Sequence, residues 1–113
     1  MHEYSIGQAL MERIEAEVAA HKAMAVHRVR LKIGELSGVE PELLASAFLI
    51  LKERTLCQDA TLDIERVPAR WVCPVCALDI PAGDVLRCRA CGEAARLLGG
   101  DEIVLAQLEM EVP

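Results

Sequence analysis

Two pairs of cysteines carry the clearest chemical signal in the sequence. Cys73 and Cys76 form the first pair, Cys88 and Cys91 form the second, and eleven residues lie between the pairs. A two-residue spacer lets both thiolates of a pair reach one metal ion from a tight turn, and four thiolates complete a tetrahedral zinc shell. A disulfide or a redox-active pair would leave the other pair unexplained. We therefore predict a structural zinc site.

The residue after each pair bears on the geometry of the predicted zinc turns. Gly92 follows the second pair and can adopt a positive φ freely, whereas Ala77 holds the matching place after the first pair. If the first turn also needs a left-handed residue, alanine costs about 1 kcal/mol there. Zinc binding contributes ~10–16 kcal/mol in small sites, so it outweighs that strain.

The N-terminus offers a second group of metal donors. The amine of Met1, the backbone nitrogen of His2 and the His2 imidazole can chelate one ion in fused rings. Such strong-field nitrogen donors suit square-planar Ni(II) or Cu(II), and Glu3 could add its amide nitrogen or its carboxylate. A histidine at position two is usually only part of a frayed terminus. The residues by themselves make this site chemically feasible and no more.

The remaining histidines have simpler structural interpretations. His21 falls near the expected end of a helix, where a cationic side chain is favoured by the helix dipole. His27 falls on the polar side of an expected strand. Cys57 stands apart from the two pairs, and we assign it no role.

Composition restricts the classes of function. The 113 residues carry a net charge of −6, which disfavours non-specific binding to nucleic acid or to an anionic membrane. No apolar run approaches the ~20 residues of a membrane span, and the N-terminus lacks the pattern of a signal peptide. Cysteines arranged for metal binding suit a reducing cytoplasm. Enzymatic activity is not expected, because no nucleophile motif occurs and four thiolates leave zinc without an open position.

Hydrophobic periodicity predicts the elements that must position these groups. Apolar residues at helical spacing predict helices over residues 5–22, with Ser5 and Gln8 at the spacing of a capping box, and over residues 41–54. Alternation predicts strands over residues 26–33, 61–67 and 102–112. The last strand changes phase between Leu105 and Leu108, so we expect a bulge near Ala106 and Gln107.

The order of these elements predicts an α/β fold in which two helices pack on a three-stranded sheet. A zinc-ribbon-like insert precedes the last strand, which must return to the sheet to bury Leu108, Met110 and Val112. The expected domains are an α/β domain over residues 1–68 and 99–113, which carries the candidate metal donors of the N-terminus, and a zinc-binding domain over residues 69–98. We call residues 69–98 the insert.

Several stretches together resemble one known family, and the likeness covers essentially the whole chain. They are the opening Met1-His2-Glu3, the run Ile33-Gly34-Glu35-Leu36-Ser37-Gly38-Val39 followed by Pro41-Glu42, the paired cysteine motifs, and Gly100-Asp101-Glu102 before the final strand. In these features the sequence resembles the HypA/HybF family, the nickel-incorporation accessory proteins of NiFe-hydrogenase maturation.

The resemblance implies a nickel metallochaperone that delivers Ni(II) to the hydrogenase large subunit together with a GTPase partner, HypB. It places the nickel ligand on His2, with the neighbouring backbone and Glu3 implicated. It places zinc on the four paired cysteines. A homodimer is compatible with these expectations.

The alternative is a zinc-ribbon module that binds other proteins without transferring nickel. A nucleic-acid module is disfavoured by charge. Residues 66–96 hold five arginines and three acidic residues, a net charge of +2, which a zinc ion with four thiolates would cancel. Single-stranded nucleic acid also needs stacking aromatics, and this segment offers only Trp71.

Overall fold

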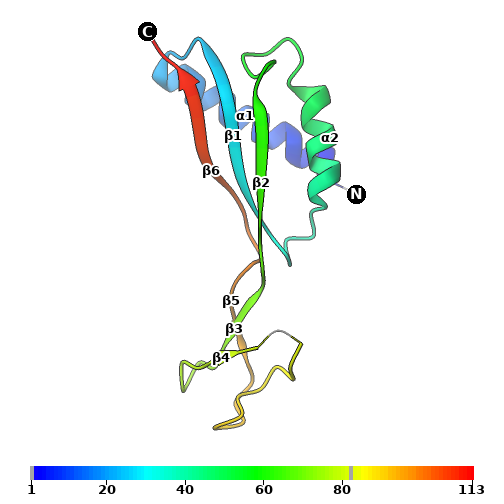
Figure 1. The fold of residues 1–113 in the computed structure, drawn as a ribbon, viewed down its shortest axis with the longest axis vertical. Helices are drawn as coiled ribbons and strands as arrows, with labels where there is room; N and C mark the ends of the chain where they lie inside the picture. Colours follow the sequence, from blue (N-terminus) through cyan, green and yellow to red (C-terminus); the bar gives the residue numbers. More distant parts are fainter. Residues whose placement is uncertain (1, 82) are drawn as a thin grey trace.

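The molecule is elongated, with principal extents of 56 × 30 × 17 Å. The computed structural model describes residues 2–81 and 83–113. The elements are α1 (Glu3–His21), β1 (Ala25–Gly34), α2 (Pro41–Leu51), β2 (Thr61–Val67), β3 (Arg70–Val72), β4 (Asp79–Ile80), β5 (Arg96–Gly99) and β6 (Ile103–Glu111). Figure 1 shows α1, α2 and their sheet at one end and the insert at the other.

The larger sheet has the strand order β2-β1-β6, with β1 parallel to β2 and antiparallel to β6. The helix α2 connects the parallel pair, as a parallel crossover requires. Alternate residues of β1, namely Val29, Leu31 and Ile33, are buried against the helices. The predicted arrangement of two helices on a three-stranded sheet, with the insert before the last strand, is confirmed.

The expected bulge in the last strand is present. Arg30 pairs with Gln107 while Leu31 pairs with Leu105, so Ala106 is the extra residue. This shift lets Leu105 and Leu108 both pack against the core. Val112 was expected to join them, but it lies beyond β6 and is 52% exposed, so that part of the prediction is wrong.

A second irregularity was not predicted. The register between β1 and β6 also shifts between Val26 and Arg28, which leaves His27 without a partner in the ladder. The shift allows Val26 and Val29 to be buried together although they stand three residues apart. A strand with strict alternation would place them on opposite faces.

The first helix begins earlier than its sequence pattern predicts. It starts at Glu3, His2 is the N-cap, and no side chain caps the helix. The predicted capping box of Ser5 and Gln8 is therefore wrong. The second helix starts at Pro41 as expected but ends at Leu51, three residues early, because Lys52–Thr55 turn away and the Thr55 hydroxyl donates to the Lys52 carbonyl at 2.6 Å.

A glycine allows the two helices to approach closely. From the sequence, Gly7 is merely a weak helix former, but in the structure it is buried where α1 crosses α2. A Cβ atom added there would lie 2.8 Å from Cδ1 of Leu51. The core beneath this contact is formed by fully buried side chains, which include Ile14, Leu44 and Phe48.

The chain passes between the two sheets at a narrow junction. A Cβ atom added to Gly100, whose φ is +97°, would lie 2.6 Å from Cα of Ala69. The loop after β1 bonds to both crossing segments, because Glu35 N–H donates to Val67 O at 2.8 Å and Leu36 N–H donates to Gly100 O at 2.7 Å. This Gly-Glu-Leu-Ser-Gly loop, residues 34–38, thus lies at the junction itself.

Candidate metal centres

The insert brings its four cysteines together. Their Sγ atoms all lie within 4.8 Å of one another, and those of Cys73 and Cys91 are 3.5 Å apart. A tetrahedral ion with Zn–S bonds of about 2.3 Å would separate its sulfur ligands by about 3.8 Å. The quartet of Cys73, Cys76, Cys88 and Cys91 therefore fits a structural zinc site, as predicted from the spacing.

The two cysteine turns have the same backbone design. Ala77 N–H donates to Cys73 O and Gly92 N–H donates to Cys88 O, each at 2.9 Å. The φ angles of Ala77 and Gly92 are +60° and +77°. The first turn thus does need a left-handed residue, and alanine occupies it at a cost of about 1 kcal/mol.

Local amides and neighbouring thiols have opposite effects on cysteine ionisation. The backbone N–H groups of Cys91 and Ala90 lower the pKa of Cys88 to about 7, which favours the thiolate that zinc binds. In contrast, the neighbouring thiol of Cys91 raises the pKa of Cys76 to about 12. A divalent ion offsets this crowding of negative charge, so the chemistry of the donor set also fits zinc.

The insert buries few of its side chains. Its buried side chains are those of Val72, Ile80, Cys73 and Cys88, within the part of the insert that the structure describes. Val75 and Val85 are 70% and 77% exposed. Three short strands, β4-β3-β5, hold this part together beside the cysteine quartet.

The candidate nickel donor His2 lies at the exposed start of α1. The first helical hydrogen bond runs from Ile6 N–H to His2 O at 3.0 Å. The N–H of His2 therefore precedes the hydrogen-bond ladder of the helix. Met1, which was predicted to supply its amine, lies outside the described residues.

Glu3 points away from solvent. Its side chain is 5% exposed, and its Oε2 accepts a hydrogen bond of 3.0 Å from the N–H of Glu40. This bond is the largest of several causes that lower the pKa of the Glu3 carboxyl group to about 2. The contact joins residues that are far apart in the sequence, and no short-range pattern in the sequence predicts it.

The other histidines lie elsewhere. His21 ends α1, at the opposite end of the helix from His2, and its Nδ1 is 2.9 Å from the carbonyl oxygen of Glu17. His27 Nε2 lies 3.1 Å from Oε1 of Glu111. Neither histidine belongs to a cluster of potential metal ligands among the described residues. Within residues 2–81 and 83–113, the four cysteines form the one group of three or more His, Cys, Asp or Glu side chains whose ligand atoms lie close together.

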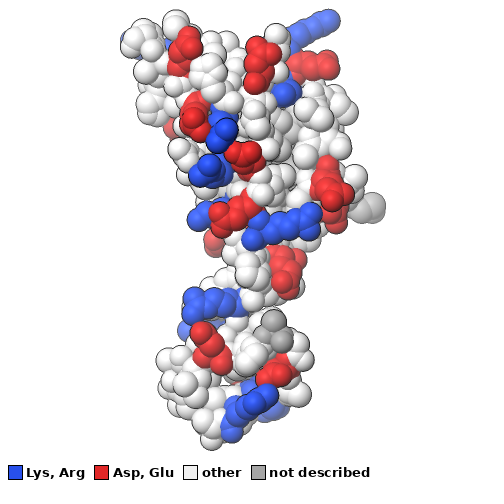
Figure 2. All heavy atoms as spheres, viewed as in Figure 1, with Lys and Arg blue, Asp and Glu red and all other residues white. Residues whose placement is uncertain are grey.

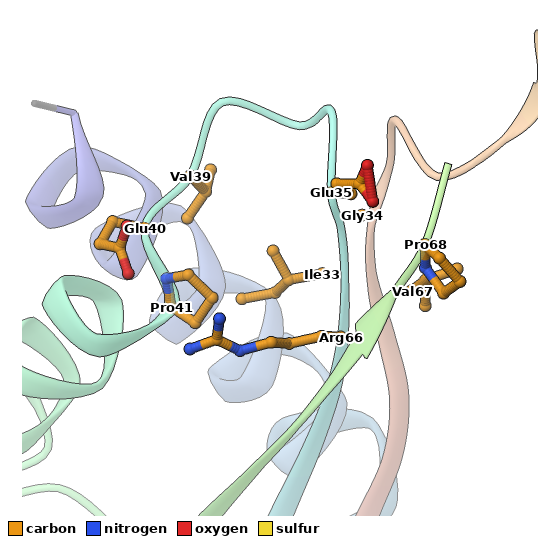
Figure 3. Close-up of a pocket in the computed structure, with 9 residues that line it drawn as sticks. All are labelled: Ile33, Gly34, Glu35, Val39, Glu40, Pro41, Arg66, Val67 and Pro68. Carbon is orange, nitrogen blue, oxygen red and sulfur yellow. The ribbon is translucent and has the colours of Figure 1, made fainter. Parts of the chain in front are cut away.

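A pocket of about 390 Å³ lies beside the Glu3–Glu40 contact, between the ends of β1 and β2 and the start of α2 (Figure 3). Its wall is largely apolar, with Ile33, Val39 and Val67 among the lining residues. Arg66 crosses it below Pro41 in Figure 3, and its Nη2 lies 3.8 Å from Oε1 of Glu42.

The surface charge is mixed. On the face shown in Figure 2, acidic and basic side chains alternate over the α/β part and the insert. On the larger sheet, Nε of Arg28 lies between carboxylates of Asp63 and Glu109, at 3.4 and 3.6 Å. This alternation differs from the continuous basic face that nucleic acid requires. Among the described residues, no helix is long and apolar enough to cross a membrane.

Comparison with known proteins gives matches over the length of the chain. Residues 1–110 match the family described as "Hydrogenase/urease nickel incorporation, metallochaperone, hypA". The hydrogenase maturation factor HypA of Nitrosospira multiformis is 40% identical over 112 residues, covering 97% of each chain. That of Wolinella succinogenes is 42% identical over 114 residues, covering 98% of this chain and 96% of the relative.

Two solved structures of HypA proteins have the same fold as this chain. The solution structure of the Ni metallochaperone HypA from Helicobacter pylori superimposes with a TM-score of 0.75 at 32% identity, covering 100% of both chains. A second solution structure of a HypA protein gives a TM-score of 0.78, also at 32% identity, covering 100% of this chain and 98% of the other.

Proposed function

Since the chain belongs to the HypA family of nickel-incorporation metallochaperones, we propose that it carries Ni(II) at its N-terminus and delivers it to the large subunit of a NiFe-hydrogenase. The observation that carries this proposal is the position of His2. Its side chain is exposed and its N–H precedes the hydrogen-bond ladder of α1. Both donors can therefore bind a metal without disrupting the helix.

The nickel donors are the Met1 amine, the His2 amide nitrogen and the His2 imidazole, with Glu3 contributing through its main-chain nitrogen. The N-terminal end of a helix carries a partial positive charge, which stabilises the negative charge of a deprotonated amide ligand. Nitrogen donors in fused chelate rings favour square-planar Ni(II). Nickel displaces protons from these groups, so its affinity falls as the pH is lowered.

The protein acts by binding and transfer rather than by catalysis. Its partners are a HypB-type GTPase and the hydrogenase large subunit, in the cytoplasm, where thiols stay reduced. The exposed Val75 and Val85 of the insert give these partners apolar surface to contact. In this proposal the zinc is structural, because four thiolates leave it no open position for substrate.

Nickel titration of the zinc-loaded full-length chain tests the proposal. His2→Ala should abolish tight nickel binding, retain one zinc per chain, and block hydrogenase maturation unless nickel is in excess. His21→Ala is the matched control, because it removes an exposed imidazole from the other end of α1 and should bind nickel normally. Equal nickel affinity in His2→Ala and wild type would overturn the N-terminal assignment.

A further inference from the structure

The Glu3 carboxylate occupies a position between two helix starts. Glu3 is the first residue of α1, and Glu40 is the N-cap residue of α2, directly before Pro41. The hydrogen bond from Glu40 N–H to Glu3 Oε2, 3.0 Å long, joins the two. The first backbone N–H groups of a helix lack partners within the helix. One carboxylate thus meets the positive ends of both helices, where negative charge is favoured.

A second contact fixes the same end of α1. Gly7, one turn beyond Glu3, is buried against α2, and a Cβ atom added there would meet Leu51, Ala47 and Leu44. The start of α1 is therefore held at two successive turns, through a backbone approach at Gly7 and a hydrogen bond at Glu3. His2 is covalently next to this anchored residue, so the anchor restricts where the backbone of His2 can lie.

The two neighbouring side chains differ sharply in environment. His2 is exposed, whereas the Glu3 side chain is 5% exposed and is directed toward Glu40. Nickel bound at Oε2 would compete with the Glu40 hydrogen bond, and an ion held by the exposed His2 would have to reach a carboxylate that is only 5% exposed. The main-chain nitrogen of Glu3 requires no movement of the side chain.

We propose that the Glu3 carboxylate is a positioning group of the nickel site and not a nickel ligand. It holds the first turn of α1 on the start of α2, so that the N-terminal donors begin from a restricted set of conformations. Ordering a loose terminus opposes binding, and an anchor reduces that cost. This inference rests on the proposed N-terminal nickel site, and it assigns Glu40 N–H, 37 residues away in the sequence, as the partner that makes the anchor work.

Two substitutions separate a positioning role from a ligand role. Glu3→Gln keeps an oxygen that can accept the Glu40 hydrogen bond but replaces the carboxylate, whereas Glu3→Ala removes the acceptor. Nickel is titrated into zinc-loaded full-length protein and followed by its d–d absorption. We expect Glu3→Gln to bind within about threefold of wild type, and Glu3→Ala to bind about 10–100-fold more weakly, as is typical when the partner of a ligand is lost. The absorption spectrum of bound nickel should keep its shape in both.

Ser5→Ala is the matched control, because Ser5 is an exposed residue of the same helical turn, and it should bind nickel like wild type. Equal weakening in Glu3→Gln and Glu3→Ala, with a changed nickel spectrum, would identify the carboxylate as a ligand and overturn the proposal. Wild-type affinity in Glu3→Ala beside a weakened His2→Ala would overturn the positioning role alone. Wild-type affinity in His2→Ala would instead overturn the proposed function.

A measurement without nickel tests the anchor directly. Hydrogen exchange of the Glu40 amide, followed by NMR, should be faster in Glu3→Ala than in wild type, with Glu3→Gln close to wild type. Loss of protection at Glu40 in Glu3→Ala supports the anchor. Unchanged protection of that amide in Glu3→Ala overturns it, whatever the nickel titration gives.

Discussion

The α/β part and the insert are stabilised by different means. The α/β part has an apolar core in which Phe48, Ile14, Leu44 and Leu31 are almost inaccessible to solvent. The insert buries Val72 and Ile80, together with two of its cysteines, and exposes Val75 and Val85. A segment this short cannot order its backbone through so small an apolar area. The comparison indicates that hydrophobic burial holds one region and metal coordination holds the other.

The largest expected effect comes from removing zinc. Cys88→Ser, or a strong chelator, should unfold the insert because the ~10–16 kcal/mol of a zinc site is lost. The α/β part should persist because its core contains no metal ligand. Hydrogen exchange followed residue by residue distinguishes the regions, and metal analysis should find one zinc per chain. A zinc-free protein that keeps a protected insert would contradict the comparison.

A second prediction weakens the apolar core of the α/β part and leaves the zinc site intact. Phe48 is 1% exposed, so Phe48→Ala should destabilise the α/β part by about 3–5 kcal/mol through the lost burial and the cavity left behind. Zinc content should stay at one per chain if the insert folds on its own metal. Leu49→Ala is the control, because this neighbour in α2 is exposed. Loss of zinc along with the core would show that the two regions fold as one unit.

The junction between the regions gives an intermediate effect. Gly100→Ala places a methyl group 2.6 Å from Cα of Ala69 at a positive φ, so it should destabilise the protein by about 3 kcal/mol. Gly99→Ala is the control, since an added Cβ there meets nothing within 4 Å. Chemical denaturation compares the two variants. Equal stability would indicate that the crossing strands separate readily.

The smallest effects are expected within the insert itself. Ala77→Gly should strengthen zinc retention by about 1 kcal/mol, because the left-handed conformation at φ +60° suits glycine. Gly92→Ala, at φ +77° with open space around it, should weaken retention by about the same amount. Competition with a chelator measures both. The two substitutions should change zinc retention in opposite directions. If both strengthen it or both weaken it, the two cysteine turns do not share one backbone design.

Much of the fold could be predicted because its signals are local. The spacing of the cysteines predicted the quartet that the structure brings together and that fits zinc, since four ligands in two tight turns need few assumptions about the remaining chain. The change of phase between Leu105 and Leu108 located the bulge at Ala106, because the side chains of a strand alternate strictly between its faces. The short motifs in the opening and in the loop after β1 were sufficient to indicate the family.

Other features depend on how distant segments meet, and only the tertiary structure decided them. Ser5 and Gln8 have the spacing of a cap, yet α1 begins at Glu3, whose carboxylate bonds to Glu40. Gly7 is a poor helix former in isolation, but it is the residue at which α2 approaches α1. Helical periodicity gives the face of each helix and not the partner it meets. The start of α1, which carries the proposed nickel donor His2, is therefore set by a contact that forms only after β1 and the loop that follows it have brought α2 beside α1.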